Sequence, residues 1–84
     1  MKCTILHETR GRMRVRLCCR RMTLEQADVL EYYLRAVDGV QSVKVYDRTR
    51  DAVVVYDAER GSIIRALGAF SFAKAEAMEL VPEH

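Results

Sequence analysis

The sequence predicts an α+β fold in which a four-stranded antiparallel sheet carries two helices on one of its faces. Two segments alternate between apolar and polar residues, which is the period of a half-buried strand. Two other segments repeat apolar residues at spacings of three and four, which is the period of an amphipathic helix. With 84 residues and 9.7 kDa the chain has room for one small core, so we expect residues 1–84 to form a single domain.

The composition is that of a soluble globular domain. Half of the residues are hydrophobic and 31% are charged, which argues against disorder. No apolar run approaches the ~18–20 residues of a transmembrane helix, and the first residues lack the apolar stretch of a secretory signal. Cys3, Cys18 and Cys19 are odd in number, which predicts reduced thiols in a cytosolic setting rather than a disulfide framework.

Residues 11–17 are predicted to form a strand with two different faces. The apolar face consists of Met13, Val15 and Leu17, and the basic face consists of Arg12, Arg14 and Arg16. Residues 3–7 upstream also have an extended pattern, and Gly11 is expected to mark a bulge or bend between the two segments.

A helix is predicted over residues 24–38. Thr23 and Gln26 have the spacing of a capping box, in which each side chain binds the other residue's backbone amide. The apolar stripe of this helix consists of Ala27, Leu30, Leu34 and Val37. Gly39 is expected to end the helix, because a residue without a Cβ is favoured there.

The remaining segments predict a hairpin, a second helix and a last strand. Residues 40–47 and 52–56 are predicted strands joined by a polar turn at 48–51. Val43 and Val45 would face inward and Lys44 and Tyr46 outward. In strand 52–56, either Val53 and Val55 or Val54 and Tyr56 would point inward. A helix over 60–68, ended by Gly68, and a weak strand over 74–81 complete the set.

These elements follow the order βαββαβ, which is the ferredoxin-like arrangement. Right-handed crossovers would place both helices on one face of the sheet and leave the other face open to solvent or a partner. The side chains predicted to line the open face are Arg12, Arg14, Arg16, Lys44 and Tyr46.

Charge is distributed unevenly along the chain. Residues 1–22 contain seven basic residues and one acidic residue, whereas residues 23–84 contain seven basic and eleven acidic residues. Such a basic region could attract phosphate, anionic lipid or an acidic protein face. The same charges could instead find partners within the domain. Three arginines on one strand face favour either counter-charges or an anionic ligand.

Two alternative functions follow from the motifs. Cys18 and Cys19 are candidate ligands for copper(I) or zinc, because thiolates suit these metals. Adjacent cysteines on extended backbone point to opposite faces, so the alternative is one core cysteine and one exposed cysteine. The basic face with Tyr46 also allows a small RNA-binding domain, although the RNA-recognition signature is missing and nucleic acid is not the favoured partner. The sequence shows no nucleophile–base pair, no P-loop and no glycine-rich phosphate-binding loop.

Four segments carry a resemblance to a known family. They are residues 7–15 (HETRGRMRV), 36–40 (AVDGV), 43–45 (VKV) and 55–57 (VYD). Together they resemble the N-terminal heavy-metal-associated-type domain, lacking C-x-x-C, of some bacterial heavy-metal-translocating P-type ATPases. Related copper-binding domains carry C-x-x-C in the loop after the first strand. This chain has adjacent Cys18 and Cys19 in the corresponding region.

The resemblance implies a regulatory or docking domain of a metal-cation pump, with weak or no direct metal binding. The parent would be a longer integral membrane protein that hydrolyses ATP and transports the ion elsewhere in its sequence. Because the aspartyl-phosphate motif of such pumps is absent from these 84 residues, this chain alone is not expected to be an enzyme. This domain would lie at the cytoplasmic face of the membrane. Its expected partners are other domains of the same pump or the anionic membrane surface, with a metal ion and a second copy of the chain as further candidates.

Overall fold

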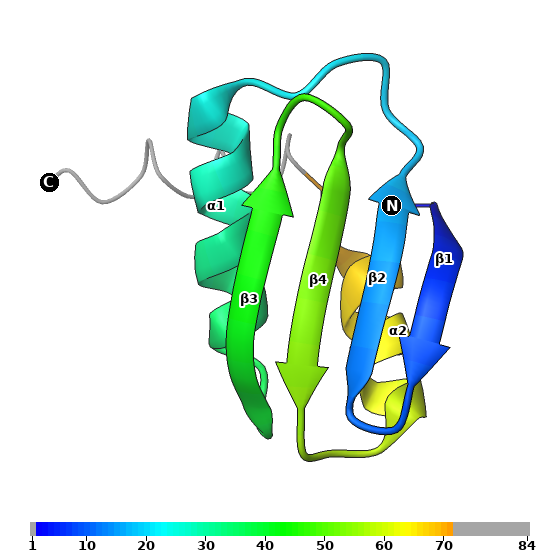
Figure 1. Ribbon diagram of the computed structural model, residues 1–84. Helices are drawn as coiled ribbons and strands as arrows, with labels where there is room; N and C mark the ends of the chain where they lie inside the picture. The colour runs from blue at the N-terminus through cyan, green and yellow to red at the C-terminus, as the bar shows by residue number, and fades with distance from the viewer. Residues whose placement is uncertain (1, 72–84) are drawn as a thin grey trace, which may run out of the picture.

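The computed structural model describes residues 2–71 of the 84. Six elements follow one another in this part of the chain: β1 (Cys3–Thr9), β2 (Arg12–Leu17), α1 (Leu24–Arg35), β3 (Val40–Tyr46), β4 (Asp51–Tyr56) and α2 (Arg60–Ala69). The strands form one antiparallel sheet in the order β1-β2-β4-β3, and both helices lie on the same side of it (Figure 1). The predicted α+β class, with four strands and two helices, is confirmed.

The order of the elements differs from the prediction. Within residues 2–71 it is ββαββα, because the segment before Gly11 is a full strand rather than a short lead-in. A tight turn at Arg10 and Gly11, with Gly11 at φ 81°, folds β1 back along β2 and makes it an edge strand. This turn confirms the bend expected at Gly11, and a separate bulge lies between Ile5 and His7. The predicted strand 74–81 lies outside the described residues.

The first helix begins as predicted and ends early. The capping box is present: Thr23 Oγ1 accepts from the Gln26 amide at 3.1 Å, and Gln26 Oε1 accepts from the Thr23 amide at 3.0 Å. The helix ends at Arg35, because the amides of Ala36 and Val37 bond carbonyls three residues back and tighten the last turn. Gly39 has φ 88°, and a Cβ there would lie 2.6 Å from the Cβ of Ala58.

The core lies between the sheet and the helices. The inward residues of β2 are the predicted ones, and β4 turns Val54 and Tyr56 inward, which settles the alternative left by the sequence. Ala27, Leu30 and Leu34 of α1 and Ile63 and Leu67 of α2 cover them. Gly68 does not end the second helix, which continues to Ala69. Because the apolar alternation directs these side chains to the helices, no helix or strand of residues 2–71 covers the opposite face of β2.

Candidate functional site

The uncovered face of the sheet carries the predicted basic residues. Arg12, Arg14 and Arg16 are all exposed, whereas Met13, Val15 and Leu17 between them are buried. Lys44 and Tyr46 of β3 are also exposed, and contacts described below place them on the same face. The alternating patterns of β2 and β3 therefore predicted which side chains lie on this face. We call this set of five residues the basic face.

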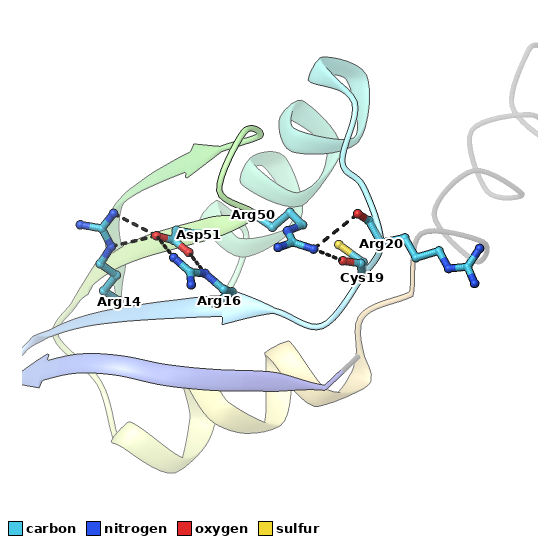
Figure 2. A network of polar contacts seen from close by, with 6 residues as sticks. All are labelled: Arg14, Arg16, Cys19, Arg20, Arg50 and Asp51. Carbon is cyan, nitrogen blue, oxygen red and sulfur yellow. Dashed lines mark hydrogen bonds and ion pairs between the residues drawn. The ribbon is translucent and has the colours of Figure 1, made fainter.

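A carboxylate lies between two of the three arginines. Asp51 Oδ2 accepts from Arg14 Nη2 at 2.9 Å and from Arg14 Nε at 3.2 Å, and Asp51 Oδ1 accepts from Arg16 Nε at 2.9 Å (Figure 2). The register explains this contact, because Asp51 pairs directly with Arg16 across β2 and β4. Sequence analysis placed Asp51 in a polar turn, and this was wrong: it is the first residue of β4. Asp51 belongs to the sheet because it pairs with Arg16 of β2 and with Tyr46 of β3.

Asp51 is buried by its own partners. Its side chain is 1% exposed, while the side chains of Arg14 and Arg16 are 45% exposed and cover it. Burial acts to raise the pKa of Asp51, but the hydrogen bonds and positive charges of Arg16 and Arg14 outweigh burial and hold the pKa below its ordinary value. Asp51 is therefore a fixed anion that neutralises part of the basic face.

The same contact leaves donors pointing away from Asp51. A guanidinium has five N–H donors, and Asp51 engages only the Nε and Nη2 sides of Arg14 and Arg16. Within residues 2–71 no acceptor is paired with the Nη1 group of either arginine. Asp51 thus holds two guanidinium groups in place while a part of each stays available to another anion.

Tyr46 lies close to two cations on this face. The guanidinium carbon of Arg14 is 5.8 Å from the centroid of the Tyr46 ring, and the Lys44 ammonium is 5.9 Å from it. Both distances are within the range of a cation–π contact. The ring is 43% exposed, so it also presents apolar surface beside the charges.

Arg12 occupies the other end of the strand and differs from its neighbours. It pairs with Val55 of β4 rather than with an acid. It is exposed, and in the described part of the chain no carboxylate lies within ion-pair distance of it. Arg12 is therefore the member of the arginine row whose charge is least compensated.

The cysteine pair lies in the loop between β2 and α1. Cys18 is exposed, and Cys19 is half-buried and packs against the core, as the non-metal alternative predicted. Burial raises the pKa of the Cys3 thiol; the charge of the N-terminus opposes this, and Cys18 and Cys19 add to the rise. The three thiols thus share one end of the sheet. However, among the described residues no group of three or more His, Cys, Asp or Glu side chains is arranged to hold a metal ion.

Arg50 holds this loop in place. Its Nη1 group donates to the carbonyl oxygens of Cys19 at 2.7 Å and Arg20 at 3.4 Å (Figure 2). Its own carbonyl accepts from the Leu17 amide at 2.8 Å, and its φ of 63° is unusual for a residue with a side chain. This role of Arg50 was not predicted, because the residue lies in a polar turn and no sequence pattern indicates its contacts with the distant Cys19 and Arg20.

No protein-family model matches the chain. It is 37% identical over 78 residues to a zinc-exporting P-type ATPase of Mycobacterium marinum, and this match covers 93% of the chain but 11% of that relative. No helix among residues 2–71 has the length and apolar character to cross a bilayer. The chain is thus similar, over nearly its whole length, to a small segment of a metal-transporting P-type ATPase.

Proposed function

We propose that residues 1–84 form one domain of a heavy-metal-cation-transporting P-type ATPase and that this domain is a regulatory docking module. In this proposal the domain binds metal weakly or not at all, and other parts of the pump hydrolyse ATP and move the ion. The similarity to a zinc-exporting pump supports the parent class. The parent class in turn favours a position at the cytoplasmic face of a membrane.

The basic face is the observation that carries the docking role. It has four cations, Arg12, Arg14, Arg16 and Lys44, and the anion Asp51 is paired with only Arg14 and Arg16, so the face keeps an excess of positive charge. Like charges close together on one sheet face repel each other. Asp51 relieves this repulsion for two arginines only, and a negatively charged partner would relieve the remainder. The face is therefore suited to docking against an anionic surface.

The experiment compares two arginines of the full-length protein that carries this chain. Arg12→Glu reverses a charge on the basic face, whereas Arg65→Glu reverses an exposed charge on α2, on the other side of the sheet. Neither arginine has a carboxylate partner among the described residues. We expect Arg12→Glu to change the rate of metal-stimulated ATP hydrolysis and Arg65→Glu to leave it unchanged. Equal rates in the wild type and Arg12→Glu would contradict the docking role.

A second candidate function is metal binding through Cys18 and Cys19. The observation in its favour is that these thiols lie at the same end of the sheet as Cys3 and influence its pKa. Soft thiolates suit copper(I) and zinc, and the relative is named as a zinc exporter. Competition with a chelator under reducing conditions tests this candidate. If the cysteines bind metal, the double variant Cys18→Ser/Cys19→Ser should have a lower affinity for copper(I) or zinc than the wild type. Equal affinities would contradict this candidate function.

A further inference from the structure

We infer that the anionic surface recognised by the basic face is a layer of phospholipid headgroups. This inference rests on the proposed docking function and names its partner. It follows from three features of the described residues: the excess of cations on the basic face, the donors that Asp51 leaves unused, and the apolar groups that lie among the cations.

The two faces of the domain differ in charge more than its two ends do. The end that holds the β2–α1 loop and the β3–β4 turn (Figure 1) has three exposed cations, Arg20, Arg21 and Arg48, but it also has the exposed acid Glu25 at the start of α1. The opposite end carries three exposed anions, Asp38, Asp57 and Glu59, and two exposed cations, Arg10 and Arg60.

The helix layer carries charges of both signs. Helix α1 exposes Glu25, Asp28 and Arg35, and helix α2 exposes Arg60 and Arg65. The basic face has four cations, with Asp51 between two of them, so a flat anionic layer would attract this face more strongly than the helix layer and would orient the domain. Electrostatic attraction to anionic lipid is strong only near the membrane surface, which favours such an arrangement of cations in one plane.

The available donors suit headgroups better than a rigid acidic protein. Asp51 already gives Arg14 and Arg16 the carboxylate that a protein partner would offer. What remains are single outward-facing groups, the Nη1 groups of these arginines and the side chains of Arg12 and Lys44, spread over two strands. Phosphates of a fluid layer can move to meet such separated donors, whereas carboxylates on a folded surface have fixed spacings.

Apolar groups interrupt the cations on this face. Tyr46 is 43% exposed and lies near Arg14 and Lys44, and Val53 and Val55 of β4 are half-buried beside the arginine row. A tyrosine ring with a polar tip is favoured at a membrane interface, where one part of the ring meets apolar groups and the hydroxyl meets water. The face thus combines positive charge with the interfacial groups that a bilayer surface accommodates.

The test is sedimentation of the 84-residue chain with lipid vesicles. One vesicle contains phosphatidylcholine alone, and the other contains phosphatidylcholine and phosphatidylglycerol. We expect binding to the anionic vesicle only, with an affinity that falls as salt rises. Each basic residue near an anionic membrane contributes roughly a fivefold change in affinity, so Arg12→Glu should weaken binding by at least that factor. Arg65→Glu, the matched reversal on α2, should leave the affinity nearly unchanged.

Three results would overturn the inference: no binding of the wild-type chain to anionic vesicles, equal binding to neutral vesicles, or equal losses in Arg12→Glu and Arg65→Glu. Thermal unfolding of both variants checks that each is folded. Failure here is separable from failure of the docking function. If Arg12→Glu alters ATP hydrolysis but the chain ignores vesicles, the face docks on an acidic protein surface instead. If the chain binds vesicles but ATP hydrolysis is unaffected, lipid binding stands and the regulatory role does not.

Discussion

Arginines of the same strand face have different roles at the two ends of β2. At one end, Arg14 and Arg16 share the carboxylate of Asp51, and their guanidinium groups are held by hydrogen bonds of 2.9–3.2 Å. At the other end, Arg12 lies opposite Val55, and the described residues offer it no carboxylate. The difference shows that an arginine row is not one functional unit. Arg14 and Arg16 are held within the fold by Asp51, whereas Arg12 has no described carboxylate and is the residue on which the proposed docking role depends.

Of the changes considered, removal of the shared carboxylate should cause the largest loss in the free energy of unfolding. Asp51→Ala deletes the acceptor for two charged donors, and hydrogen bonds to charged groups contribute about 1.5–3 kcal/mol each. Because both arginines remain half-exposed and can bind water, we expect a loss of only about 1–3 kcal/mol in the free energy of unfolding. Urea denaturation measures it. A loss no larger than that of Arg12→Ala would show that Asp51 has no structural role.

Acid should weaken the Asp51 end of the strand selectively. The pKa of Asp51 is lowered in the folded state, so its contribution is fully present above the unfolded pKa of about 3.9 and is lost as pH falls through the lower folded value. We expect the wild type to lose more stability than Asp51→Asn as the pH falls below about 4. Unfolding curves across this range test the difference. Parallel curves for the two proteins would contradict it.

A fourth arginine, Arg50, also has a structural role, but outside the arginine row of β2. It resembles Arg14 and Arg16 in having described acceptors, but these are the backbone carbonyls of Cys19 and Arg20. Arg50→Ala should cost about 1 kcal/mol of stability and loosen the loop. The half-buried Cys19 should then react faster with a thiol reagent, whereas the already exposed Cys18 should react at an unchanged rate. Mass spectrometry of the labelled protein distinguishes the two sites.

The smallest effect on stability is expected at Arg12. Exposed residues without partners usually change the free energy of unfolding by less than about 0.5 kcal/mol when replaced, so Arg12→Ala should unfold like the wild type. A matched denaturation series with Asp51→Ala makes the comparison direct. If Arg12→Ala lost as much free energy of unfolding as Asp51→Ala, Arg12 would have a structural partner. That result would contradict its proposed docking role.

Local pattern was sufficient for much of the fold. The alternation of β2 placed three arginines on one face and three apolar residues on the other, because successive side chains of a strand point to opposite sides. Thr23 and Gln26 identified the start of α1, since a capping box involves only residues close together in the chain. Lys44 and Tyr46 were placed on the open face by the same alternation.

Contacts between segments that are distant in the chain could not be predicted from the sequence. Asp51 and Arg50 are near in sequence to other polar residues, and nothing local indicates that one would bridge two arginines and the other would hold the cysteine loop. The edge position of β1 was also missed, because strand order depends on which backbones pair rather than on any single strand. Met22, buried from within the loop, has no periodic neighbour to identify it.

The residue alternation alone was enough to put a row of guanidinium groups on one side of the sheet, since a strand has a period of two whatever it pairs with. Pairing of β2 with β4 was needed to decide how much of that charge is available. It sets Asp51 opposite Arg16 and Val55 opposite Arg12, and so compensates one end of the row and leaves the other exposed. Register is a property of two strands together, and neither strand's own sequence contains it.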